Sequence, residues 1–178
     1  FRDMPGPVFL RGESVTLHPQ GEDDVQFLQR LINHPDVWPS LTSVEPLTEA
    51  DEREWIEDTD GDSVDLLVCA DGERVGTMGL NRFNETWGVA ELGYMIAPEA
   101  QGNGYATDAA RRLVRYGFED RRLHKIMANV YETNPASQRV LEKIGFEQEG
   151  VLREQAYVRG ERLDVIRYGL LTHEFDAS

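Results

Sequence analysis

The stretch that most restricts how this chain can fold lies between residues 91 and 106. A predicted strand ending at Ile96 leads through a loop with Gly102 and Gly104 into a helix expected to begin at Tyr105. The first N–H groups of a helix have no partner within the helix, and the helix dipole makes that end positive. Glycine lets a backbone come close to a ligand. The pattern therefore predicts a phosphate site where the loop meets the helix.

Two familiar phosphate loops are excluded by spacing. A dinucleotide-binding fingerprint needs a third glycine or alanine where Thr107 stands, and a P-loop needs a lysine followed by serine or threonine, which this loop lacks. For the loop taken alone, the alternative is a plain tight turn before a helix.

A second motif follows the predicted strand of residues 125–131. Asn134 stands directly before Pro135, and a helix then runs to Ile144 and stops at Gly145. Asparagine is a favoured N-cap, proline suits the first helical position and glycine suits the C-terminal end. Ser137 follows one helical turn after Asn134 and faces the same side.

Together the two motifs resemble those of the GNAT superfamily of N-acetyltransferases, specifically its RimJ/RimL-like branch. Gln101-x-x-Gly104-x-Ala106 matches the family's pyrophosphate loop, and Asn134-x-x-Ser137, followed by the segment 142–146, matches its second cofactor motif. The resemblance covers residues 8–171. It implies that acetyl-CoA binds between two splayed parallel strands and that an amine attacks the thioester directly.

The resemblance also implies which residues bind acetyl-CoA. The pantetheine arm is expected along the strand, and the pyrophosphate on the loop and first helical turn. Asn134 is expected to bridge the arm. From their i, i+4 spacing, Arg111 with Arg115 and Arg139 with Lys143 are the candidates for the 3′-phosphate, although a solvated, salt-bridged helix face is the favoured alternative for Arg111 and Arg115. The expected cofactor-binding residues are Tyr94, Met95, Ile96, Gln101, Gly102, Asn103, Gly104, Tyr105, Ala106, Thr107, Asn134, Ser137 and Arg139.

The catalytic groups depart from the family pattern. Leu141 stands where many members have a tyrosine that protonates the leaving thiolate, so Ser137 is the expected acid. Some relatives carry a glutamate before a tyrosine on the penultimate strand, but here Ala156 precedes Tyr157. Glu154, two residues earlier, and Glu91 are the candidate bases. For Glu91, the alternative is a structural tie between the sheet and an arginine.

The expected fold is α/β (α+β), with a mixed, mostly antiparallel sheet, one splayed parallel strand pair and about four flanking helices in a single domain of residues 1–178. The spacing of apolar residues and the positions of turn residues predict the strands and helices. We expect strands at residues 8–18, 66–70, 75–83, 89–96, 125–131, 146–154 and 162–171, and helices at 22–33, 48–58, 105–120 and 135–144. Trp55 is expected on the apolar side of the second helix.

Composition narrows the function further. The chain carries 33 acidic and 18 basic residues, a net charge of −15, which argues against nucleic acid as a partner. Sixteen of the bases are arginine. An excess of acidic residues with so little lysine is typical of a protein from a halophilic source. The alternative explanation of the excess is an acidic groove that binds a basic substrate. Cys69 lies in an apolar run and is expected to be buried and inert. The four histidines lack ligand spacing, so no metal site is expected.

Neither a long apolar run nor a secretion signal at Phe1–Pro5 is present, so we expect a cytoplasmic protein with no membrane partner. The expected acceptor is a protein N-terminal α-amine, with a polyamine or antibiotic amine as the alternative. A non-catalytic acetyl-CoA-binding module and an interaction domain that keeps only the fold also stay open, as do a monomer and a homodimer.

Overall fold

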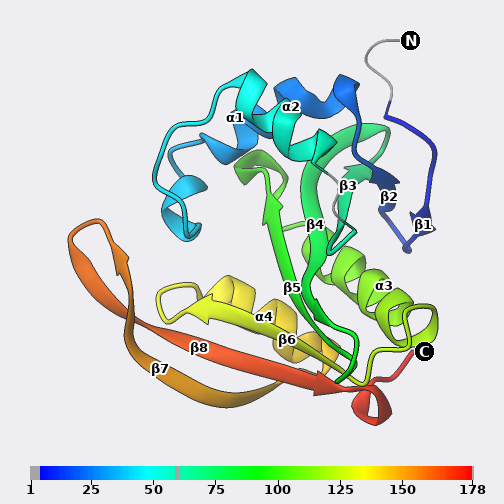
Figure 1. Cartoon of the computed structure of the whole chain (residues 1–178), viewed down its shortest axis with the longest axis vertical. Helices are drawn as coiled ribbons and strands as arrows, with labels where there is room; N and C mark the ends of the chain where they lie inside the picture. Colours follow the sequence, from blue (N-terminus) through cyan, green and yellow to red (C-terminus); the bar gives the residue numbers. More distant parts are fainter. Residues whose placement is uncertain (1–4, 59–60, 178) are drawn as a thin grey trace.

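A computed structural model describes residues 5–58 and 61–177, in which eight strands form one sheet flanked by helices (Figure 1). Among these described residues the strand order is β1-β2-β3-β4-β5-β6-β8-β7, and only β5 and β6 pair in parallel. The strands are β1 (Leu10–Arg11), β2 (Thr16–Pro19), β3 (Val64–Ala70), β4 (Glu73–Asn84), β5 (Val89–Ile96), β6 (Lys125–Tyr131), β7 (Glu147–Val158) and β8 (Glu161–Leu171). The predicted fold class is confirmed.

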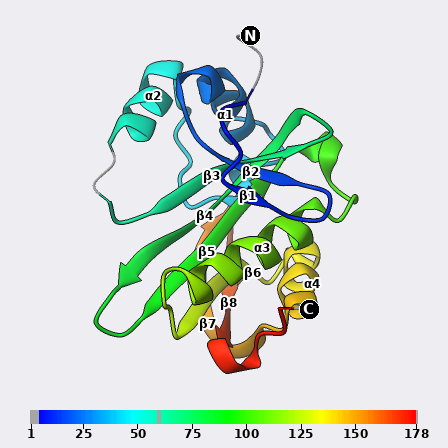
Figure 2. The same ribbon diagram turned by 90° about the vertical axis from the view of Figure 1, so that its right-hand side faces the viewer.

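The helices are α1 (Val25–Ile32), α2 (Glu49–Glu57), α3 (Tyr105–Glu119) and α4 (Pro135–Ile144), with short 3₁₀ turns at Glu22–Asp24, Trp38–Ser40, Pro98–Ala100 and Thr172–Glu174. Figure 2 shows α1 and α2 grouped together, away from α3 and α4. The predicted inward residues of α3 are all buried: Ala109, Ala110, Leu113, Val114 and Phe118.

Side chains of β3 are buried on both faces of the sheet. Leu66 and Val68 belong to the main core with α3, while Leu67 and Cys69 pack with Leu28 of α1. This explains the unbroken apolar run in the sequence. Cys69 is buried as predicted, and burial raises the pKa of its thiol to about 11.

Two expectations about the N-terminal half are wrong. The segment 8–18 is a hairpin of β1 and β2, not one strand, because the Asp108 carboxylate accepts hydrogen bonds from the N–H groups of Glu13, Ser14 and Val15 and holds a turn there. Trp55 is 53% exposed, and the buried residue of α2 is Glu52. Residues Phe1–Met4, which bear on secretion, lie outside the described residues.

The parallel strands β5 and β6 part after a short paired region. Val89, Ala90 and Glu91 pair with residues 125–127, and no pairing continues beyond them. β5 stays paired to β4 as far as Ile96, and β6 stays paired to β8 as far as Tyr131. The result is a V-shaped opening in the sheet, as the family resemblance implied.

The topology brings both motifs to the open end of this V. Because β5 and β6 are parallel, their carboxyl ends point the same way. β5 ends at Ile96 and leads into α3, while β6 ends at Tyr131 and leads into α4. The N-termini of α3 and α4 therefore lie beside the gap between the strands.

Candidate active site

A first cavity of about 320 Å³ lies at the open end of the V. It collects almost every residue that the sequence predicted for acetyl-CoA: Tyr94, Met95, Ile96, Gln101, Gly102, Gly104, Tyr105, Ala106, Thr107, Asn134, Ser137 and Arg139. Asn103 does not line it, since its side-chain amide turns back and donates to the Ala100 carbonyl at 2.9 Å. Lys143 and Ser40 also line this cavity.

The loop before α3 offers a row of unused donors. Gly102 and Gly104 adopt left-handed backbone angles, with φ of +83° and +79°, which glycine accepts without strain. The first hydrogen bond of α3 is from the Asp108 N–H to the Gly104 carbonyl. Within the described part of the chain, no group accepts from the N–H groups of residues 102–107. Converging free N–H groups at a helix N-terminus suit a phosphate.

Asn134 caps α4 and keeps one donor unused. Its Oδ1 accepts a hydrogen bond from the Ser137 N–H at 3.1 Å. Its Nδ2 donates to no acceptor among residues 5–58 and 61–177. The amide of Asn134 can therefore cap the helix and donate to a ligand at the same time.

The hydroxyls of Tyr94 and Ser137 lie 2.6 Å apart and share a hydrogen bond. Burial raises the pKa of Tyr94, and the hydrogen bond with Ser137 opposes this shift only in part. The phenol is therefore protonated at neutral pH. Sequence reasoning assigned Tyr94 only to the pantetheine arm, because no local signal joins residues 43 positions apart.

A second cavity of about 330 Å³ meets the first. The two share four lining residues, which are Ser40, Tyr94, Asn134 and Ser137. Beyond this junction the second cavity is lined by charged and polar residues of the strands, including Arg82, Glu91, Asn129, Gln155 and Arg167. A thioester in the first cavity and an amine in the second would meet beside Ser137.

Glu91 is the only acidic residue among the described residues that line the second cavity. Its Oε1 accepts a hydrogen bond from Asn129 Nδ2 at 2.9 Å, and its Oε2 lies 3.5 Å from Arg82 Nε. The structural tie to an arginine, which the sequence left open, is thus present. The cavity also leaves the carboxylate within reach of an acceptor.

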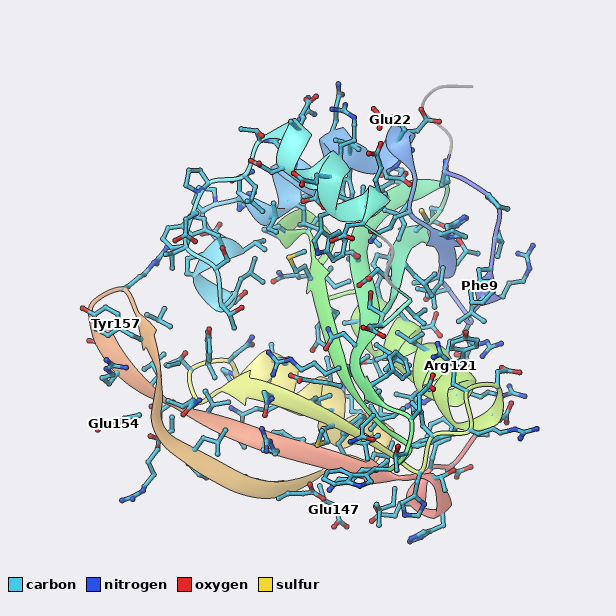
Figure 3. All side chains as sticks on the ribbon, viewed as in Figure 1. Phe9, Glu22, Arg121, Glu147, Glu154 and Tyr157 are labelled. Carbon is cyan, nitrogen blue, oxygen red and sulfur yellow. The ribbon has the colours of Figure 1, made fainter. Side chains whose placement is uncertain are left out.

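Glu154 lies away from both cavities. The ladder between β7 and β8 is irregular between Leu152 and Ala156, and Glu154 there has φ of +51°. Figure 3 shows its side chain on the outer side of β7. This bulge breaks the alternation that would have put Glu154 on the inner face, and Gln155 lines the second cavity instead. Tyr157 is 62% exposed near the tip of the hairpin (Figure 3).

No helix in the described ranges is long and apolar enough to span a membrane. Over the same residues, no three side chains of histidine, cysteine, aspartate or glutamate come together as a metal site would require.

Comparisons with known proteins agree with this geometry. A profile described as "Acetyltransferase (GNAT) domain" matches residues 14–147. A Bacillus subtilis protein named "Putative ribosomal N-acetyltransferase YdaF" is 36% identical over 126 residues, which is 71% of this chain and 68% of the relative. Spermidine N(1)-acetyltransferase of Escherichia coli K12 is 30% identical over 165 residues, covering 91% of this chain and 88% of the relative.

A solved structure shares the fold over most of both chains. The crystal structure of spermidine N-acetyltransferase from Vibrio cholerae in complex with CoA and spermine aligns with a TM-score of 0.85 at 27% identity, covering 90% of this chain and 97% of that one. The matched profile spans well over half of the chain and includes both motifs. The chain belongs to the GNAT family and is an N-acetyltransferase that uses acetyl-CoA.

Proposed function

We propose that the enzyme transfers the acetyl group of acetyl-CoA to a protein N-terminal α-amine by direct attack. The observation that carries the proposal is the junction of the two cavities at Tyr94 and Ser137. One cavity has the donors that CoA needs, and the other has a carboxylate for an incoming amine.

In this proposal the free N–H groups of residues 102–107 bind the pyrophosphate, and Asn134 Nδ2 donates to a carbonyl of the pantetheine arm. Arg139 and Lys143 are preferred for the 3′-phosphate, because both line the first cavity. Arg111 lines neither cavity and donates to the Lys143 carbonyl at 3.4 Å.

The reaction needs one base and one acid. The amine arrives protonated, since an α-amine has a pKa of about 8, and Glu91 accepts that proton directly or through a water molecule. The amine nitrogen then forms a bond to the thioester carbon, and the bond from that carbon to sulfur breaks. Ser137 Oγ gives its proton to the leaving thiolate and is resupplied by the Tyr94 hydroxyl, 2.6 Å away, which in turn takes up the second proton that the amine nitrogen loses.

A polyamine is the second candidate acceptor, favoured by the resemblance of this chain to spermidine acetyltransferases. Against it stands the charge of the second cavity, where Glu91 is accompanied by Arg82 and Arg167. A polycation would meet two positive side chains and one acid. An N-terminal α-amine brings a single positive charge, which one carboxylate can match.

An acceptor panel tests the proposal. Thiol release from acetyl-CoA is measured with N-terminal peptides, spermidine and aminoglycosides, in dilute buffer and in molar salt. Peptides are expected to turn over fastest. Binding of acetyl-CoA without thiol release from any amine would instead make the protein a binding module.

Glu91→Gln tests the base. Glutamine keeps the size and the hydrogen bond to Asn129 but cannot take a proton, so kcat is expected to fall, most at low pH, while acetyl-CoA affinity stays the same. Glu154→Gln is the matched control, because Glu154 is exposed and lines neither cavity. Equal pH–rate profiles for the parent and Glu91→Gln would show that Glu91 is not the base.

A further inference from the structure

We infer that the acceptor carries a carboxylate close to its amine, and that Arg167, assisted by Arg82, binds this carboxylate. The inference rests on the proposed function, because it concerns the acceptor that the second cavity takes. It is drawn from the charged residues that line that cavity, whose net charge is positive while that of the whole chain is negative.

The net charge of the residues that line the second cavity is unexpected for this chain. Acids outnumber bases 33 to 18 over the sequence, yet the charged residues that line the cavity are two arginines and one glutamate. These give the cavity one net positive charge in a protein of net charge −15. A local field of this sign favours an anionic group on the ligand.

Arg167 has unused donors inside the cavity. It lies half-buried on β8, and its Nε donates to Asn129 Oδ1 at 3.1 Å. The described residues offer it no ion pair and no second hydrogen bond. Arginine carries five N–H donors, and its terminal nitrogens match a carboxylate in bidentate geometry.

Asn129 sets the distance between the two charges that the acceptor would meet. Its Nδ2 donates to Glu91 at 2.9 Å and its Oδ1 accepts from Arg167 at 3.1 Å. One carboxamide group therefore separates a carboxylate from a guanidinium. An acceptor with an ammonium group and a carboxylate a few bonds apart complements this pair, with the ammonium toward Glu91 and the carboxylate toward Arg167.

Arg82 adds positive charge at the rim. Its side chain is 78% exposed, and its Nε lies 3.5 Å from Glu91 Oε2. It stands at an irregularity of β4, between Asn81 and Asn84, with φ of +52°. The exposed guanidinium is placed to attract an anion toward the mouth and to repel a polyamine.

The chemistry that fits is an α-amine with an Asp or Glu side chain in the first two residues of a peptide, or the carboxylate of a free amino acid. The experiment compares kcat/KM for peptides that begin Ser-Asp, Ser-Asn and Ser-Lys, with free aspartate and spermidine alongside. We expect Ser-Asp to exceed Ser-Asn by about tenfold or more, since the contact is a charged hydrogen bond.

Variants assign the preference to Arg167. In Arg167→Gln the ratio of Ser-Asp to Ser-Asn is expected to fall to near one, while Arg167→Lys keeps part of it. Arg115→Gln is the control, because Arg115 pairs with Glu119 on the surface of α3 and lines neither cavity. Calorimetry with acetyl-CoA checks that each variant is folded and binds its cosubstrate.

The outcomes separate this inference from the proposed function. Equal rates for Ser-Asp and Ser-Asn in the parent, or a ratio unchanged in Arg167→Gln, would overturn the inference alone. Spermidine as the best acceptor would overturn both the inference and the proposed N-terminal acceptor. Free aspartate faster than any peptide would support the carboxylate contact but overturn the protein N-terminus as the acceptor, which would then be a small molecule. No turnover with any amine, in a protein that binds acetyl-CoA, would overturn both.

Discussion

At the scale of single residues, the contact between Tyr94 and Ser137 joins β5 to α4 at the point where the two cavities meet. The residue that many family members use as acid is here Leu141, which is fully buried. The second hydroxyl at the junction therefore comes from Tyr94 of β5 and not from α4.

Ser137→Ala is expected to lower kcat by roughly a hundredfold or more, since it removes the acid. Tyr94→Phe should lower kcat less, because the serine hydroxyl remains. Steady-state kinetics measure kcat, and calorimetry measures acetyl-CoA affinity. Tyr116→Phe serves as the control, because the Tyr116 ring packs against Phe9. Full turnover in Ser137→Ala would mean that water or another group protonates the thiolate.

Glu52 gives a prediction about pH. It is 6% exposed in α2, and burial raises the pKa of its carboxyl. A raised native pKa favours the folded state at pH values where the group is protonated, and ionisation at pH 7 costs stability. Glu52→Gln should therefore raise the free energy of unfolding at pH 7, and this gain should vanish as the pH falls below about 4.5, the usual pKa of glutamate. Urea unfolding at several pH values tests this, and a gain that persists in acid would contradict it.

At the scale of elements, the loop before α3 depends on glycine for two separate reasons. Gly104 has φ of +79°, and a Cβ there would meet no atom of the described residues within 4 Å apart from its chain neighbours. A larger side chain would strain the backbone and fill space that the pyrophosphate needs, but would not clash within the protein.

Gly104→Val is expected to abolish acetyl-CoA binding with a modest loss of stability, about 1–2 kcal/mol for the left-handed conformation. Gly72→Val is a matched control, because Gly72 has φ of +78°, equally open surroundings and a place in the β3–β4 turn outside both cavities. Calorimetry and thermal melting separate the two effects. Similar acetyl-CoA affinity in both variants would show that the loop does not bind the pyrophosphate.

At the scale of the whole molecule, the charge of −15 acts on the entire fold. Repulsion among carboxylates spread along the chain opposes the compact state, and salt screens it. In molar KCl the Debye length falls to about 3 Å. The melting temperature is therefore expected to rise between dilute buffer and molar KCl, as for a protein from a salt-rich medium. A flat or falling melting temperature would instead favour a role for the acids in substrate binding.

Signals confined to a few neighbouring residues predicted much of the fold. The turn at Asp71-Gly72 has φ of +51° and +78°, as a two-residue hairpin requires. The capping box of Thr48 and Asp51 and the buried face of α3 also follow the sequence. These features depend on local backbone preference and helical periodicity, which act within one turn or one strand.

The sequence by itself determined the family, the mixed sheet and the two cofactor motifs, because each depends on patterns within short runs of residues. Only the tertiary structure decided which side chains surround the acceptor. Arg82, Glu91, Asn129 and Arg167 come from four strands, and the bulge in β7 removes Glu154 from that group. Strand pairing sets these positions, and the free energy that selects one register is spread over contacts between residues far apart in the chain.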